Sequence, residues 1–140
     1  MELGSAKAPR IGDVYMMEFY GKGSAQNGFR PGIIIQNNIG NQNSPNVVAI
    51  PLTSAIKKMG QPTHVLLPSD ETGLKMNSIA LCECPMSIPK DNIGVYVTTI
   101  PHHYMREVAI AFLLEHPVLT YLDASETLKV RKESYSLVAA

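Results

Sequence analysis

Cysteine is scarce in this chain: its 140 residues contain 2, Cys82 and Cys84, in a segment that is typical of a strand. At that spacing both side chains point to one face, and the rise between them does not favour a disulfide. Two thiols with no further Cys or His pair nearby also make a poor zinc site. The sequence therefore predicts two reduced thiols on one face of a sheet.

Excess charge is also absent, because 12 Lys and Arg balance 12 Asp and Glu to give a net charge of +0. A protein that coats nucleic acid depends on neutralising phosphates, so this balance argues against that class but allows a local basic site. The chain shows neither a long apolar run nor a signal peptide at its N-terminus. We therefore expect a cytoplasmic protein with no membrane contact.

The usual catalytic motifs are missing as well. The chain contains no GxSxG, Walker loop, GxGxxG or HExxH, and its histidines lack the spacing of metal ligands. The residues alone thus indicate no metal site, no cofactor and no protein nucleophile. One reaction class fits this absence, because RNA carries its own nucleophile, the 2′-hydroxyl beside each phosphate. An enzyme that uses it needs positioned donors for the charge that develops at the phosphate.

Short segments rich in β-branched and aromatic residues dominate the chain as far as residue 100. The predicted strands cover residues 14–20, 32–36, 47–53, 63–67, 78–83 and 95–100. The isoleucine run at 33–35 indicates a strand buried on both faces, and Pro51 indicates an edge or a bulge. Glycine- and asparagine-rich stretches at 21–28 and 37–46 predict loops.

From Pro101 the hydrophobic period becomes helical, and Pro117 is expected to end that helix. A second helix is predicted from Ser125, as its N-cap, to Ser136. Strands followed by helices indicate one α+β domain over residues 1–140, with a small, mostly antiparallel β-barrel-like sheet.

Arg30 is the arginine best placed to meet a phosphate. It ends the first glycine-rich loop directly before Pro31, a position that is held by the scaffold yet open to solvent. The guanidinium fork can donate two parallel hydrogen bonds to phosphate oxygens. From the residues alone, an ordinary surface arginine or a salt bridge is the simpler interpretation.

Seven motifs follow one another in order between residues 10 and 122. They are GDVY at 12–15, GSAQNGFRP at 23–31, IIQNNIGN at 34–41, SPNV at 44–47, PLTS at 51–54, PTHV at 62–65, and Gly73-Leu74 with SIALCE at 78–83. In this order they resemble the MazF/PemK family of endoribonuclease toxins from type II toxin–antitoxin systems.

The resemblance implies a homodimer of SH3-like β-barrels that cuts single-stranded RNA at a short sequence without a metal or cofactor. It implies attack by the 2′-hydroxyl, which leaves a 2′,3′-cyclic phosphate and a 5′-hydroxyl. It also implies a cognate MazE-like antitoxin that covers the RNA groove. Carried over by motif, Arg30 and Thr53 are the catalytic pair. The substrate-binding residues are Ser24, Gln26, Asn37, Ser54, Glu83, Cys84 and Met86.

The chain departs from the family pattern at three places. The glutamate of the family's first loop is Ala25 here, which removes a carboxylate from the site. The positions after Glu83 differ from the family's Q-I-R, so the cleaved sequence cannot be carried over. Residues 123–140 lie beyond the resemblance, either as a helix that covers the barrel or as a loose tail.

Three alternatives stay open. The first is a poison of gyrase on the same barrel, as in CcdB. The second, motivated by Ala25, is a catalytically impaired toxin that still binds its antitoxin. The third is an unrelated β-barrel interaction module, for which the seven ordered motifs leave little room.

Overall fold

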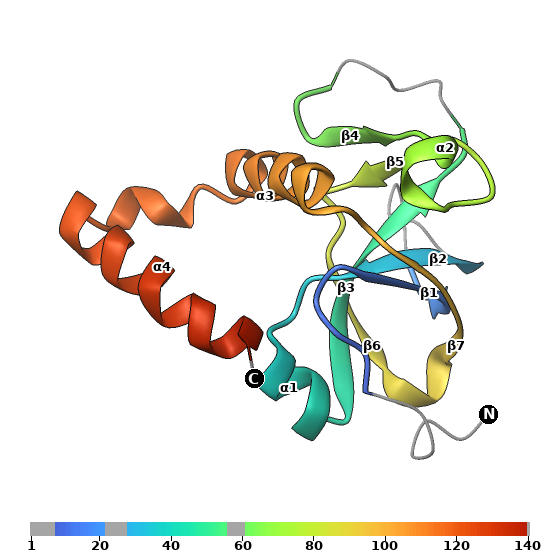
Figure 1. Ribbon diagram of the computed structural model, residues 1–140, viewed down its shortest axis with the longest axis horizontal. Coiled ribbons are helices and arrows are strands. Elements are labelled where there is room, and N and C mark those ends of the chain that lie inside the picture. The colour runs from blue at the N-terminus through green and yellow to red at the C-terminus, as the bar shows by residue number, and fades with distance from the viewer. Residues whose placement is uncertain (1–7, 22–27, 56–60, 140) are drawn as a thin grey trace.

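The computed structural model describes residues 8–21, 28–55 and 61–139, and it shows an α+β fold, as expected (Figure 1). Its strands are β1 Asp13–Phe19, β2 Gly28–Ile34, β3 Asn46–Thr53, β4 His64–Leu67, β5 Ser78–Leu81, β6 Met86–Pro89 and β7 Ile93–Thr99. Its helices are α1 Asn38–Asn43, α2 Ser69–Thr72, α3 His102–Glu115 and α4 Ala124–Ala139, with 3-10 turns η3 Lys90–Asn92 and η4 Val118–Tyr121.

The sheet is organised around β3. The strand order is β4-β5-β3-β2-β1-β7, and β6 also pairs with β3. One edge of β3 pairs with β2, while its other edge pairs first with β6 up to Ala49 and then with β5 from Leu52. Of the two expectations for Pro51, an edge or a bulge, the edge was therefore wrong. Pro51 is tolerated in a central strand because it falls where one edge of β3 changes partner.

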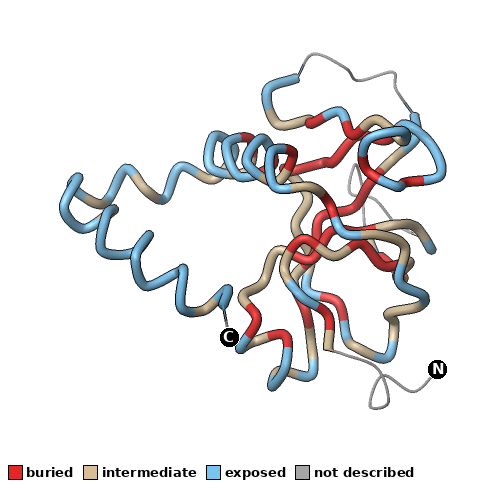
Figure 2. Tube along the Cα trace, in the orientation of Figure 1, coloured by how far each residue is buried: buried red, intermediate tan, exposed pale blue. Residues whose placement is uncertain are grey.

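The curved sheet buries an apolar cluster on each face, and the strands supply both by alternation. Val14 and Ile33 belong to one cluster, whereas Tyr15 and Ile34 belong to the other. The predicted burial of the isoleucine run on both faces is thus confirmed. Figure 2 shows the buried residues concentrated in the strands, with the outer helices largely exposed.

Several expected boundaries differ from the structure. The strand predicted over 78–83 ends at Leu81, so Cys82 and Cys84 lie beyond it and not on a face of the sheet. Two other differences bear on the site and on α1. Strand β2 begins at Gly28, so Arg30 lies within a strand and not at the end of a loop. The stretch 37–46 was expected as a loop but contains α1, because the Asn37 side chain accepts a hydrogen bond from the Gly40 amide at 2.9 Å and caps the helix. Residues 22–27 of the other predicted loop lie outside the described residues.

The C-terminal helices differ in how they are held. Helix α3 packs against the first apolar cluster through Tyr104, Val108 and Ala111. Helix α4 buries no residue and folds back until its end reaches α1 (Figure 1). There the Val138 carbonyl accepts hydrogen bonds from Asn38 Nδ2 at 2.6 Å and Arg10 Nη2 at 3.0 Å.

The start of α4 also corrects the sequence prediction. Asp123 caps the helix, not Ser125. The Asp123 carboxylate accepts from the Glu126 amide at 2.8 Å, and the Glu126 carboxylate accepts from the Asp123 amide at 3.0 Å. This reciprocal pair is a capping box, which defines a helix start better than a lone serine. Within the described residues, no helix is long and apolar enough to cross a membrane.

We expect Gly32→Ala to destabilise the fold. A Cβ at this position would meet Phe19 Cζ at 2.7 Å and Met17 Sδ at 2.9 Å, and both side chains are fully buried. Overpacking of this kind costs roughly 1–3 kcal/mol, which lowers the melting temperature by several degrees. Thermal unfolding of the variant measures the effect, and a melting temperature equal to that of the parent protein would contradict the packing described here.

Candidate active site

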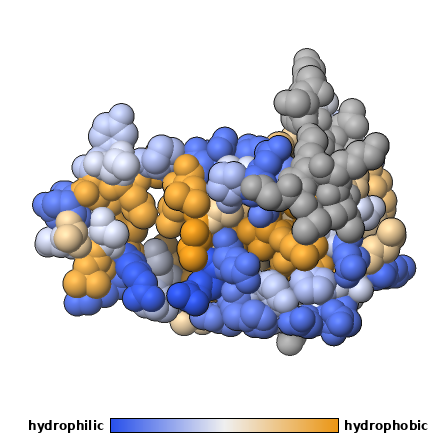
Figure 3. Space-filling model, turned by 90° about the horizontal axis from the view of Figure 1, so that it is seen from above, coloured by the Kyte–Doolittle hydropathy of each residue, from blue (hydrophilic) through white to orange (hydrophobic). Residues whose placement is uncertain are grey.

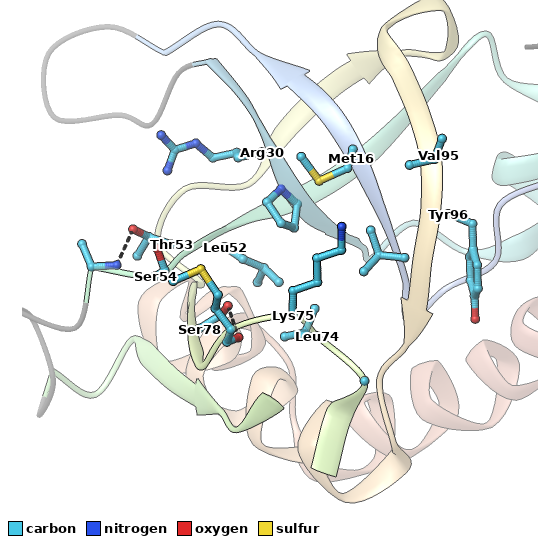
Figure 4. Close-up of a pocket in the computed structure, with 15 residues that line it drawn as sticks. Met16, Arg30, Leu52, Thr53, Ser54, Leu74, Lys75, Ser78, Val95 and Tyr96 are labelled. Atoms are coloured by element: carbon cyan, nitrogen blue, oxygen red, sulfur yellow. Dashed lines mark hydrogen bonds between the residues drawn. The ribbon is translucent and has the colours of Figure 1, made fainter. Parts of the chain in front are cut away.

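A pocket of about 670 Å³ opens beside the ends of β2 and β3 (Figure 4). Strands β1, β2, β3 and β7 and the segment after α2 supply its walls. The lining side chains include Met16, Arg30, Leu52, Thr53, Ser54, Leu74, Lys75, Met76, Ser78 and Val95. Most of this surface is apolar. The charged side chains among these lining residues, Arg30 and Lys75, are both cations.

Strands β2 and β3 bring Arg30 and Thr53 to the same end of the pocket. The pairing of these strands runs from Ile34 opposite Ala49 to Gly32 opposite Pro51. Arg30 and Thr53 each lie two residues from the end of this pairing, one on β2 and one on β3. Figure 4 shows both side chains at one end of the pocket. The two residues predicted as a catalytic pair therefore line the same pocket.

The Thr53 hydroxyl has a fixed environment. Its oxygen accepts a hydrogen bond from the Ala55 amide at 3.1 Å, so its own proton can still be donated outward. Ser54 follows at the exposed end of β3 and lines the same pocket. A hydroxyl donor next to a guanidinium suits an anion with several acceptor oxygens.

The opposite rim of the pocket is the segment from Gly73 to Ser78, which hydrogen bonds hold in place. Thr98 Oγ1 donates to the Thr72 carbonyl at 2.9 Å, where α2 ends. Gly73 has a φ of +81°, and a Cβ there would lie 2.6 Å from Thr98 Oγ1, so only glycine fits. The Tyr104 hydroxyl donates to Glu71 at 2.8 Å, and this bond raises the pKa of Tyr104 to about 12.

Further along this segment, Asn77 Oδ1 accepts from the Ser69 amide at 2.8 Å, and Ser78 Oγ donates to the Met76 carbonyl at 2.9 Å. The rim is thus fixed at both ends. The sequence did not identify Lys75, Met76 and Ser78 as site residues. The family motif formed by Gly73-Leu74 and residues 78–83 was the sequence feature that pointed to this segment.

The other predicted substrate-binding residues do not line this pocket. Asn37 caps α1, and Met86 packs against the second apolar cluster. Glu83 Oε2 pairs with His64 Nε2 at 2.8 Å, whereas Glu83 Oε1 is buried without a hydrogen-bond partner among the described residues. Cys84 is partly exposed after β5. Ser24 and Gln26 lie outside the described residues, so their placement stays a prediction.

Possible metal ligands are dispersed over the fold. In the parts of the chain that the structure describes, no three His, Cys, Asp or Glu side chains converge on a common point.

Comparison with known proteins identifies the class. The model of the family described as PemK-like, MazF-like toxin of type II toxin–antitoxin systems matches residues 10–114. The chain therefore belongs to this toxin family. Helix α4 lies beyond the matched region.

Individual relatives agree with this assignment. The chain is 36% identical over 100 residues to the endoribonuclease MazF of Staphylococcus saprophyticus, a match that covers 71% of this chain and 83% of that protein. An endoribonuclease in complex with its cognate antitoxin, from a mycobacterial species, superposes with a TM-score of 0.64 at 25% identity and covers 79% of this chain and 96% of its own. MazF from Deinococcus radiodurans gives a TM-score of 0.66 at 22% identity over 76% of this chain and 94% of its own, which supports the fold.

The two cysteines differ in environment, and this difference is testable. Cys82 is fully buried, and burial together with the nearby charge of Glu83 raises the pKa of its thiol to about 12. Thiol reagents attack the thiolate, so the native protein at pH 8 should be alkylated at Cys84 but not at Cys82. Cys82 and Cys84 share the tryptic peptide 76–90, so its fragmentation in tandem mass spectrometry reads out the two sites, with labelling in denaturant as the control. Equal labelling of both thiols in the native protein would refute the buried position of Cys82.

Proposed function

We propose that this protein, an endoribonuclease toxin by family, cuts single-stranded RNA at a short sequence by a metal-independent reaction at Arg30 and Thr53. The observation that carries the proposal is that these two residues, from neighbouring strands, lie at one end of the same pocket. A guanidinium fork and a hydroxyl donor at one place suit a phosphodiester whose charge grows during the reaction.

In the proposed reaction the 2′-hydroxyl oxygen of the substrate attacks the adjacent phosphorus, and the bond from phosphorus to the 5′-oxygen breaks. The products are a 2′,3′-cyclic phosphate and a 5′-hydroxyl. Arg30 donates to the non-bridging oxygens, and Thr53 donates one further hydrogen bond to the same phosphate. Ala25 offers no carboxylate for proton transfer, so water takes the proton of the 2′-hydroxyl and another protonates the leaving oxygen.

The remaining substrate contacts are proposed on the family motif. Ser54 lines the pocket with the catalytic pair, which supports its role. Further contacts are assigned to Ser24, Gln26, Asn37, Glu83, Cys84 and Met86. Because Asn37, Glu83, Cys84 and Met86 lie outside the pocket, they would meet nucleotides further along the strand.

We also propose a cytoplasmic homodimer that a MazE-like antitoxin neutralises. The relative that is solved with its cognate antitoxin supports the antitoxin. Ile33, Ile34, Val47 and Ile50 are fully buried within the subunit, so these strands offer no apolar face to a partner subunit. The outer side of α3 does, because Ile110, Leu113 and Leu114 are exposed there. Figure 3 shows apolar patches of this kind between polar ones on the upper face.

Ala25 favours one competing function, a toxin that binds its antitoxin but no longer cuts RNA efficiently. Action as a gyrase poison is the other alternative. A supercoiling assay with purified gyrase tests this alternative. A gyrase poison would inhibit supercoiling and leave RNA intact, whereas an endoribonuclease would cut RNA and leave supercoiling unchanged.

The substrate's own 2′-hydroxyl should be required. An RNA with a single deoxynucleotide before the scissile phosphate should resist cutting, because no group is left there to attack phosphorus. The all-ribose RNA should be cut equally well in excess EDTA and in magnesium. Gel analysis of both substrates measures this. Cutting of the deoxy substrate, or activity that EDTA abolishes and magnesium restores, would refute the mechanism.

Arg30→Ala should lower the single-turnover cleavage rate about 10²- to 10³-fold, equivalent to ~3–4 kcal/mol, as for loss of one oxyanion donor. Arg30→Lys should rescue little, since a point charge does not reproduce the two-pronged hydrogen bond. Thr53→Ala should cost less than Arg30→Ala, and Thr53→Ser should keep most activity because it retains the hydroxyl.

Melting temperatures of the same variants separate catalysis from stability. Arg30 is half-buried on a strand end, and its loss should leave the fold intact. A stable Arg30→Ala protein with full activity would remove the basis of the proposed function. A variant with lowered melting temperature and unchanged cutting would show that Arg30 is structural.

A further inference from the structure

Lys75 is the second cation of the pocket, and it comes from the rim opposite Arg30. Its side chain extends from the segment after α2 into the pocket toward Met16, while Arg30 lies nearer Thr53 (Figure 4). No acidic side chain lines the described part of the pocket. Two cations at separate points of one cavity suit a ligand that carries two separate negative charges.

The position of Lys75 is fixed by its neighbours. Before Lys75 in the chain, the Thr72 carbonyl accepts from Thr98 Oγ1 at 2.9 Å. After it, Asn77 Oδ1 accepts from the Ser69 amide at 2.8 Å, and Ser78 Oγ donates to the Met76 carbonyl at 2.9 Å. The backbone that carries the lysine is therefore held on both sides, so less conformational entropy is lost when it binds a ligand.

Within the described part of the chain, the Lys75 ammonium makes no ion pair or hydrogen bond. The nearest acids in sequence are Asp70 and Glu71, and the Glu71 carboxylate accepts the Tyr104 hydroxyl instead. A structural salt bridge therefore does not explain why this lysine extends into the pocket.

The surface between the two cations is apolar. Leu52 and Leu74 are buried at its base, and Met16 and Val95 form the wall on the side of β1 and β7. Such a surface accepts the flat face of a nucleobase, whereas the charges at either end accept phosphates. The pocket thus matches one nucleotide unit with a phosphate on each side.

We propose that Lys75 binds the RNA phosphate adjacent to the scissile one and so positions the nucleotide between them. This inference rests on the proposed function, because it assumes that Arg30 and Thr53 hold the scissile phosphate. Lys75 is a positioning and substrate-binding residue, so its loss should act on RNA affinity and little on the chemical step.

A binding experiment tests this without requiring cleavage. The probe is a fluorescent single-stranded RNA of mixed sequence with 2′-O-methyl sugars, which cannot be cut. Mixed sequence suffices because phosphate contacts carry no base information. Anisotropy titrations over a range of salt concentrations compare the parent protein with Lys75→Met, Lys75→Arg and Lys129→Met. Lys129 is an exposed lysine on α4, so its variant changes the net charge equally at a site far from the pocket.

Lys75→Met should weaken binding about tenfold, the loss expected for one charge-assisted hydrogen bond in a solvent-open site. The slope of log affinity against log salt should fall by about 0.7, the value for one phosphate contact on a single strand. Lys75→Arg should keep most of the affinity, and Lys129→Met should behave as the parent protein. Equal affinity and slope for Lys75→Met and Lys129→Met would overturn the assignment.

The position of the contact has its own test. In an RNA that carries the mapped cleavage site, each phosphate in turn is replaced by a neutral methylphosphonate. The parent protein should lose affinity at the phosphate next to the scissile one, and Lys75→Met should show no such loss there. A loss that persists unchanged in Lys75→Met would refute the contact.

These outcomes distinguish the two proposals. If the parent protein cuts RNA but Lys75→Met binds like the parent, only the role of Lys75 fails. If the parent protein neither cuts nor binds RNA, the proposed function fails, and the role of Lys75 fails with it. Melting temperatures are expected to agree between variants, because the Lys75 side chain is exposed.

Discussion

The register between β2 and β3 is the constraint on which the site depends. Gly32 lies opposite Pro51, and Arg30 and Thr53 each lie two residues from this pair on the same two strands. Gly32 permits the buried side chains of Phe19 and Met17 to pack directly against the strand. Because a one-residue slip would turn Arg30 to the other face of the sheet, core packing and the position of the proposed catalytic pair depend on the same pairing.

The second rim of the pocket depends on different contacts. Helix α2 is attached to β7 through Thr98 and to α3 through Tyr104 and Glu71. The pocket therefore lies between two independently fixed parts of the fold, the β2–β3 pair and the segment after α2. An anionic strand that reached both would be held at two points, which favours one register of the substrate over its neighbours.

Most strands were predictable from composition, because β-branched runs and the doubly buried isoleucines have few other uses. The failures have local causes. The residue propensities of the asparagine-rich stretch after β2 predict a loop. The Asn37 cap and the buried side chains of Asn38 and Asn41 nevertheless stabilise a short helix there. Pro51 was expected at an edge or a bulge, since a sequence does not show that one side of a central strand changes partner.

The proposed catalytic pair could be named only through the family motifs. No spacing in the sequence connects Arg30 with Thr53, and only the fold brings both residues to one pocket. Lys75 was not predicted as a site residue for a related reason, because a lysine in a turn is usually exposed to solvent. Its orientation into a pocket depends on the bond that Thr98 donates to the Thr72 carbonyl and on the bond that the Ser69 amide donates to Asn77.

The most direct test of the central claim is to incubate the purified protein with a mixed population of cellular RNA in EDTA and to map every new end. The proposed function predicts cuts in single-stranded regions at one recurring short sequence. Each downstream fragment should begin with a 5′-hydroxyl, and each upstream fragment should end in a 2′,3′-cyclic phosphate. Intact RNA, or fragments that begin with a 5′-phosphate, would contradict cleavage by the substrate's own hydroxyl at Arg30 and Thr53.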